Sequence, residues 1–236
     1  MDTPGSSLQF SKNTEYAIQI SSNDLDSEVR FPANTEIYFT VVGLASQRLQ
    51  HLLNMKQPNG IVSTILSASP GFLYYESMTP DVLKTLKQIT DAGEEDELVS
   101  LFYKIKVQEL IYFLFDRLQK RDCIRHTPIN KADADKLFLI RTVLLSDLSK
   151  PPRLPALAQM AGISLTKMKD LFKQVFGDSM YTHFQKARME EARFLVRQAH
   201  YSVSEVGFQL GFSNLSHFSR LFEKHYGITP KKYSIG

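Results

Sequence analysis

The chain has 236 residues, of which 43% are hydrophobic, and this suits one large domain or two small ones. Its one cysteine excludes an internal disulfide, and the lack of a ~20-residue apolar stretch excludes a membrane partner, so we expect a cytoplasmic protein. The net charge of +3 is uneven: residues 1–130 carry −4 (12 Lys and Arg against 16 Asp and Glu), and residues 131–236 carry +7 (16 against 9).

Short apolar runs separated by turn-forming residues predict β-strands in the first third of the chain. The predicted strands cover residues 16–20, 37–44, 61–68 and 72–75, and a predicted helix over residues 47–55 interrupts them. A closed barrel needs about eight strands. Four strands therefore predict a short module in which a barrel would be incomplete.

Two helices are predicted to follow these strands. Thr79 is a suitable N-cap before Pro80, and apolar residues recur at helical spacing beyond them. Residues 94–120 read as one long helix with an acidic start and an apolar middle, LIYFLFDRL. Such a helix suits either a homodimer interface or the central core of a monomer, and the pattern leaves both interpretations open.

A polar segment without periodicity, residues 121–131, is predicted to be a linker. It would separate a sensing or dimerisation-like module, residues 1–120, from a C-terminal domain, residues 132–236. That domain begins with a predicted helix over residues 132–148, which Lys150, Pro151 and Pro152 stop. The predicted fold class is α+β overall: a short β-containing module with two following helices, then an all-α domain of about seven helices.

The C-terminal domain contains one helical unit written twice. The first copy is LAQMAGISLTKMKDLFKQVFG (residues 157–177), and the second is VGFQLGFSNLSHFSRLFEKHYG (residues 206–227). Each copy reads as a helix-turn-helix, with Gly162 or Gly211 in the turn, and a continuous helix over residues 181–198 is predicted to connect them. Two such units in a basic segment predict double-stranded DNA as the partner, although a solvated basic face is the alternative interpretation of the charge.

A helical wheel separates buried from exposed positions in the two longer helices. In the first, with Ser164 as the predicted N-cap, the DNA-facing candidates are Thr166, Lys167, Lys169, Asp170 and Lys173. In the second, with Ser213 as the predicted N-cap, they are Asn214, Ser216, His217 and Arg220. Arg220 is the leading candidate because a guanidinium can bind guanine O6 and N7 together. Its alternatives are a phosphate contact and an ion pair with Glu223.

At these residues the chain resembles the DNA-binding domain of the AraC/XylS family of bacterial transcription regulators. The matching residues are densest in the second copy: Gly211-Phe212-Ser213, His217 to Phe222, Tyr226-Gly227, Thr229-Pro230 and Tyr233. The resemblance implies that helices 164–176 and 214–226 read two consecutive major-groove segments. It also implies an N-terminal module that binds a small effector and dimerises, and RNA polymerase is a further candidate partner.

Two positions depart from the family pattern. Asp170 stands where the second copy has Arg220, and a carboxylate that faces phosphates would repel them, unless it accepts a hydrogen bond from cytosine N4. Specificity is therefore expected to reside mainly in the second helix. Gly207 stands where Ala is usual, and Gly in a helix costs up to ~1 kcal/mol.

No catalytic, cofactor or metal site is predicted. Only His51 and His126 occur before residue 131, and no HxH pair exists, so a barrel-type metal site cannot be assembled. P-loop, GxSxG and HExxH motifs are absent from the sequence. The predicted function is a sequence-specific transcription regulator. The alternative is a DNA-tethering protein whose N-terminal half binds a partner protein instead of a small effector.

Overall fold

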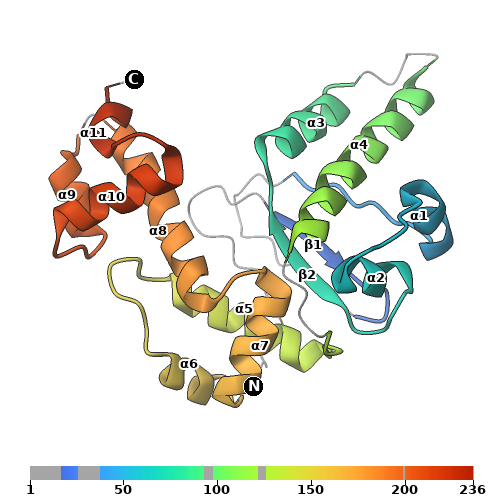
Figure 1. Ribbon diagram of the computed structural model, residues 1–236, viewed down its shortest axis with the longest axis horizontal. Coiled ribbons are helices and arrows are strands. Elements are labelled where there is room, and N and C mark those ends of the chain that lie inside the picture. Colours follow the sequence, from blue (N-terminus) through green and yellow to red (C-terminus); the bar gives the residue numbers. More distant parts are fainter. Residues whose placement is uncertain (1–16, 26–37, 93–97, 122–125, 199, 236) are drawn as a thin grey trace. The chain divides into compact units, whose positions relative to one another are not determined.

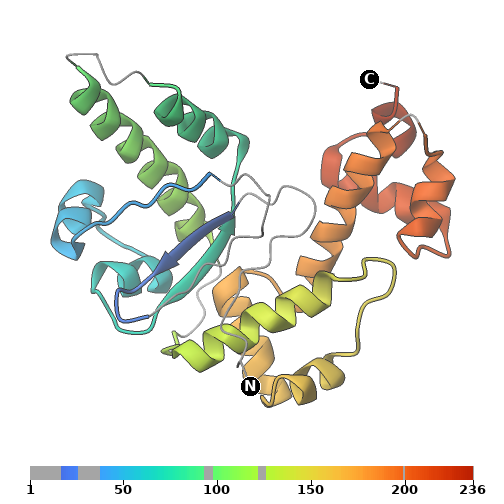
Figure 2. The same cartoon turned by 180° about the vertical axis from the view of Figure 1, so that it is seen from behind.

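The computed structural model describes residues 17–25, 38–92, 98–121, 126–198 and 200–235. These residues contain two strands and eleven helices, which confirms the α+β fold class. The chain folds into two compact units, residues 1–135 and 136–236, and the colours of Figures 1 and 2 follow them from blue to red.

The N-terminal unit packs helices on a two-stranded sheet. Strand β1 (Ala17–Ser21) pairs antiparallel with β2 (Leu73–Ser77), so that Ala17 lies opposite Ser77. The helices are α1 (Ser46–Leu53), α2 (Gly60–Leu66), α3 (Pro80–Thr90) and α4 (Val99–Lys120). Side chains from α1, α2, β2 and α4 form one core, in which Tyr74 and Leu118 are almost completely buried.

The strand predicted over residues 61–68 is wrong, because this segment is helix α2. Asn59 begins the helix by accepting a hydrogen bond from the backbone N–H of Val62 (2.9 Å). The Asn59 amide also donates to the carbonyl of Leu118 at the end of α4 (2.8 Å), which ties the two helices together. Ile61 and Ile65 of α2 are buried at helical spacing. A short apolar run fits a buried helix as well as a strand, so periodicity could not separate the two.

The strand predicted over residues 37–44 is also wrong in its described part. Residues 38–44 form no regular structure, and their apolar side chains are exposed, up to 82% for Val41. β-Branched and aromatic residues favour a strand only where a neighbouring strand packs against them, and no described strand borders this segment. The other two predicted strands are confirmed as β1 and β2, and the predicted helix over residues 47–55 is confirmed as α1.

Helices α3 and α4 confirm the two helices predicted after the strands. Thr79 accepts a hydrogen bond from the backbone N–H of Val82, and Pro80 occupies the first helical position. The acidic start predicted for the long helix, residues 94–97, lies outside the described residues, and α4 is described from Val99. The predicted linker, residues 121–131, also lies partly outside the described residues. Its described end is anchored to the N-terminal unit, because the backbone N–H of Ile129 donates to the carbonyl of Gly71 (2.7 Å).

The C-terminal unit is all-helical. From residue 131 on, the described residues form seven helices, as predicted: α5 (Lys131–Leu145), α6 (Leu154–Met160), α7 (Leu165–Phe176), α8 (Met180–Arg197), α9 (Val203–Gln209), α10 (Leu215–Tyr226) and α11 (Pro230–Tyr233). Helix α5 ends three residues before its predicted end, because the Asp147 carboxylate accepts hydrogen bonds from the backbone and hydroxyl of Ser149 and closes a turn. The predicted connecting helix is confirmed as α8.

Candidate DNA-binding surface

Two helix-turn-helix units lie in the C-terminal unit, and α8 runs from one to the other (Figure 1). Helices α6 and α7 form the first unit, and α9 and α10 form the second. Each turn contains a glycine in the left-handed region, Gly162 at φ +58° and Gly211 at φ +76°. A side chain at either position would strain the backbone.

Helix α7 has one apolar and one polar face. Ser164 begins the helix by accepting a hydrogen bond from the backbone N–H of Lys167 (3.3 Å), as predicted. The buried face consists of Met168, Leu171, Phe172 and Val175. The DNA-facing candidates lie away from that face: Thr166, Lys167, Lys169 and Asp170 are exposed, and Lys173 is half-buried. The structure thus places these five side chains on one accessible surface.

Helix α10 also has one apolar and one polar face, but its N-cap differs from the prediction. Asn214 is the N-cap, since its Oδ1 accepts a hydrogen bond from the backbone N–H of His217 (3.0 Å). The predicted cap, Ser213, is wrong by one residue, because the second turn contains one residue more than the first. The helix buries Phe218 and Phe222. The DNA-facing candidates are all exposed: Asn214, Ser216, His217 and Arg220.

Arg220 keeps its guanidinium on the exposed face of α10. Its Nε donates to the carbonyl of Ser216, one turn earlier (3.3 Å). The ion pair with Glu223 that the spacing allowed is not formed between these two described residues. The two terminal nitrogens of the guanidinium therefore remain available to a ligand at this surface.

Comparison with known proteins identifies this arrangement. A family model described as a helix-turn-helix domain matches residues 157–234. The transcriptional activator AggR of Escherichia coli is 31% identical over 159 residues, which are 64% of this chain and 53% of AggR. The activator CfaD of Escherichia coli is 30% identical over 164 residues, which are 66% of this chain and 56% of CfaD. Residues 157–234 therefore form a helix-turn-helix domain of the AraC type.

AraC-type domains bind double-stranded DNA, and the relatives of this chain are transcriptional regulators. The chain spans about half the length of these relatives. A solved AraC-type protein from Chromobacterium violaceum is 27% identical, with a TM-score of 0.41, over 45% of this chain and 95% of that one. Within the described ranges, none of the helices combines the length and apolar character needed to cross a membrane.

A buried arginine joins α8 to the second turn of the AraC-type domain. The Nε of Arg188 donates to the carbonyl of Leu210 (3.0 Å), and its Nη2 donates to the same oxygen. The guanidinium lies 3.8 Å from the centre of the Phe212 ring. Burial lowers the pKa of Arg188, while the carbonyl and the ring stabilise its charge. Arg188 therefore positions the second unit relative to α8.

The first unit is anchored through a neutral histidine. Arg141 of α5 donates from Nε to Nε2 of His183 on α8 (3.2 Å). Burial, together with the positive charge of Arg141, lowers the pKa of His183 to about 3. The rings of Phe172 and Phe176 on α7 pack against the imidazole. This contact among α5, α7 and α8 thus requires an unprotonated imidazole.

An open hollow of about 540 Å³ lies beside the start of α10 in the AraC-type domain. Its lining includes the predicted residues His217 and Arg220, and also Tyr181 and Gln185 of α8, neither of which was predicted. The Oε1 atom of Gln185 is buried without a hydrogen-bond partner. Tyr181 and Gln185 are four residues apart on one helix face, but their place beside α10 depends on how the two helices cross.

Gly207 of α9 has a steric reason to be glycine. A Cβ atom there would lie 2.6 Å from Cδ2 of Leu215 and 3.2 Å from Cδ1 of Phe218. Glycine lowers the stability of helix α9, as predicted, but it also allows α9 to approach α10 closely. An alanine would fit only if the end of the Leu215 side chain moved.

Proposed function

We propose that this protein is a sequence-specific DNA-binding regulator of transcription. The observation that carries the proposal is the pair of capped helices, α7 and α10, with polar residues on their exposed faces in an AraC-type domain. The two helices would enter two adjacent major-groove segments of double-stranded DNA. AggR and CfaD are named activators, which supports activation as the direction of control.

The two helices would contribute unequally to specificity. Lys167, Lys169 and Lys173 of α7 would bind phosphates, which hold the protein on the duplex without reading its sequence. Asp170 adds a negative charge to that surface and weakens the helix as a reader. On α10, Arg220 would bind guanine O6 and N7. Ser216 and His217 in the first turn would contact neighbouring bases or phosphates, and so would the Asn214 amide nitrogen, since its Oδ1 caps the helix.

Fluorescence anisotropy of the full chain tests this proposal. The wild type would be titrated into a duplex that it has itself selected from a random-sequence library, and into a scrambled duplex, over a salt series. Arg220→Ala is expected to weaken binding to the selected duplex by roughly tenfold to a hundredfold and to reduce the preference over the scrambled one. Glu223→Ala, three residues further along the same helix, is the control. Equal, weak binding of the wild type to both duplexes would overturn the proposal.

We further propose that the protein is a homodimer and that α4 forms its interface. Leu101, Ile105 and Tyr112 fall within about 40° of one another around the helix, and their side chains are 52%, 53% and 64% exposed. A stripe of large apolar residues on one helix is self-complementary when two copies meet about a two-fold axis. The buried side of α4 carries Ile111, Phe115 and Leu118, so the helix would join the core of its own unit to a second copy.

The proposal also covers the domains, the further partners and the location of the protein. We propose residues 1–120 as a sensing and dimerisation-like module, residues 121–131 as the linker and residues 132–236 as the DNA-binding domain. RNA polymerase and a small effector of the N-terminal module are proposed as further partners, on the family resemblance. We place the protein in the cytoplasm and assign it no catalytic activity.

A further inference from the structure

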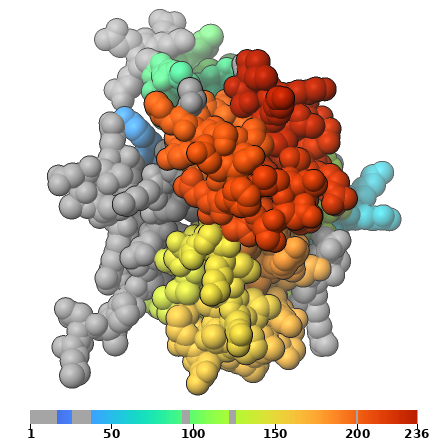
Figure 3. Space-filling view, turned by 90° about the vertical axis from the view of Figure 1, so that its left-hand side faces the viewer, coloured from blue at the N-terminus to red at the C-terminus, as the bar shows by residue number. Residues whose placement is uncertain are grey.

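The segment between α5 and α6, residues 146–153, reaches from the first helix-turn-helix unit to the second. Leu148 packs against the core of the second unit, which includes Phe212 and Phe218. The backbone of Ser149 lies directly on the second turn, because a Cβ atom at Gly211 would lie 1.8 Å from the Ser149 carbonyl oxygen. In Figure 3 the yellow part of the chain lies between the red second unit and the yellow-orange first unit.

The conformation of this segment is fixed by local hydrogen bonds and by prolines. Asp147 Oδ1 accepts hydrogen bonds from the backbone N–H of Ser149 (2.9 Å) and from its hydroxyl (2.6 Å). These hydrogen bonds lower the pKa of the Asp147 carboxyl. Pro151 and Pro152 then restrict the backbone up to Arg153, the N-cap of α6. The side chains that follow the turn are therefore presented from a defined backbone.

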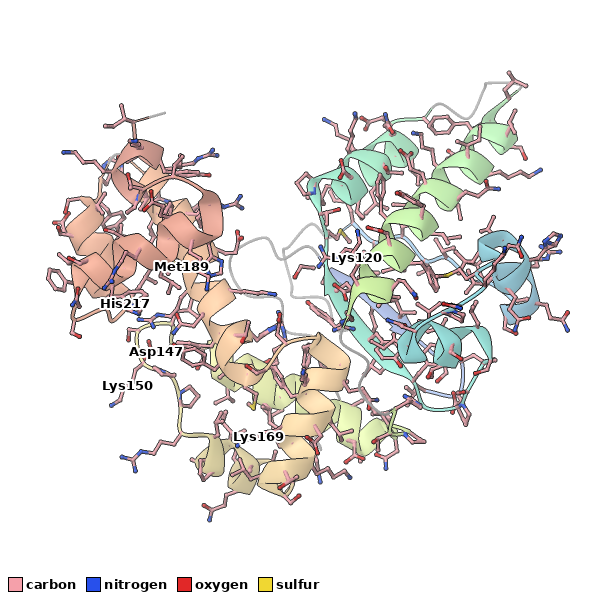
Figure 4. All side chains as sticks on the ribbon, viewed as in Figure 1. Lys120, Asp147, Lys150, Lys169, Met189 and His217 are labelled. Atoms are coloured by element: carbon pink, nitrogen blue, oxygen red, sulfur yellow. The ribbon has the colours of Figure 1, made fainter. Side chains whose placement is uncertain are left out.

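Two exposed cations extend from this backbone, Lys150 and Arg153. Neither side chain forms a hydrogen bond or an ion pair within the described part of the chain. In Figure 4, Asp147 and Lys150 lie between His217 of α10 and Lys169 of α7. Lys150 thus extends from the segment that spans the two units, and Arg153 follows it at the start of α6.

We propose that Lys150 and Arg153 bind the DNA backbone between the two segments that α7 and α10 read. This inference rests on the proposed function. Two successive major-groove segments on one face of B-DNA are separated by a minor groove with a phosphate strand on each side. A protein element that lies between the readers therefore faces phosphates, which Lys and Arg bind without sequence preference. The segment contributes affinity and register, and the choice of bases stays with the readers.

The salt dependence of binding tests the proposal. The double variant Lys150→Ala/Arg153→Ala of the full chain is compared with wild type on the selected and scrambled duplexes. Each lost phosphate contact is expected to reduce the slope of log K against log salt by about 0.9. Affinity should fall by the same factor, roughly tenfold, on both duplexes, so that the preference for the selected duplex is unchanged. The thermal unfolding midpoint should not move, because both side chains are exposed.

A matched control removes the same charge elsewhere. Lys231→Ala/Lys232→Ala lies on α11, beyond the C-terminal end of α10, and is expected to leave the slope at the wild-type value. Hydroxyl-radical footprinting on the selected duplex then locates the contact. The wild type should protect sugars at the centre of the site, and the Lys150→Ala/Arg153→Ala variant should lose that central protection alone.

The outcomes separate this inference from the proposed function. If the wild type selects a sequence but the Lys150→Ala/Arg153→Ala variant keeps its slope and its central footprint, the inference is overturned and the proposed function stands. Equal losses in both double variants would also overturn it, because they would reflect net charge alone. If the wild type selects no sequence, the proposed function fails, and the inference fails with it.

Discussion

At the residue scale, Gly211 is constrained both by its backbone angle and by a neighbour. Gly162 has a similar positive φ, but a Cβ atom there would meet nothing within 4 Å, whereas at Gly211 it would collide with the Ser149 carbonyl. Positive φ alone costs a residue with a side chain about 1–2 kcal/mol. We expect Gly211→Ala to lower the free energy of unfolding by ~2 kcal/mol more than Gly162→Ala does, measured by urea unfolding. Equal losses would contradict the contact between the segment and the turn.

His183 makes the stability of the C-terminal unit depend on pH. Its pKa falls from 6.5 to about 3 in the folded chain, because burial and Arg141 disfavour the imidazolium. The unfolded chain therefore takes up the proton first as the pH falls. The contribution of the neutral His183 to the free energy of unfolding is complete above pH 6.5. It is lost as the pH falls toward 3, by up to ~1.4 kcal/mol per pH unit.

Thermal unfolding between pH 7.5 and 4.5 tests this dependence. The wild-type midpoint is expected to fall more steeply with acid than that of His183→Gln, which has no proton to bind at this position. Other acid-sensitive groups are common to both proteins and cancel in the comparison. Parallel curves would show that the imidazole does not titrate as proposed.

At the element scale, the start of α10 depends on one side chain. Asn214 Oδ1 accepts the hydrogen bond from the backbone N–H of His217, whereas Ser213 accepts none from any residue that the structure describes. Removing an N-cap costs about 0.5–2 kcal/mol. We expect Asn214→Ala to destabilise the domain by ~1 kcal/mol and Ser213→Ala by less than about half of that, in chemical unfolding at neutral pH. A larger loss for Ser213→Ala would restore the cap predicted from the sequence.

The elements that the sequence predicted correctly have strong local signals. Thr79 followed by Pro80 marks the start of α3, and Ser164 marks the start of α7. The strand predicted over residues 61–68 is wrong because a short apolar run is compatible with two secondary structures, and only the N-cap at Asn59 marks this one as a helix. The strand predicted over residues 37–44 is wrong in its described part, residues 38–44, because this composition favours a strand only beside a partner strand.

The candidate site likewise has features that local sequence predicts and features that it does not. The exposed faces of α7 and α10 follow from helical periodicity, which a wheel reads directly. The position of Gln185 beside Arg220 and that of Ser149 on Gly211 follow from how helices and segments distant in sequence pack together. No periodicity within one helix encodes such contacts, so they could not be predicted from the residues alone.

At the scale of the whole molecule, the exposed stripe of α4 predicts the oligomeric state. Leu101→Glu/Ile105→Glu would place two charges in the proposed interface and is expected to yield the 27.0 kDa monomer in sedimentation equilibrium, where the wild type would have twice that mass. Lys84→Ala/Lys87→Ala on α3 changes the net charge equally and should keep the dimer. A wild type that sediments as a monomer at micromolar concentration would contradict the proposal.

The segment 146–153 and helix α8 together leave the separation of the two readers little freedom. If the distance between α7 and α10 is fixed, the DNA must bend to fit both helices. The energy of bending a duplex depends on its sequence. Flexible TA and CA steps at the middle of the site would then be favoured over a stiff A-tract, which a competition between duplexes that differ only there can measure. Such a regulator would discriminate among base pairs that none of its side chains touches.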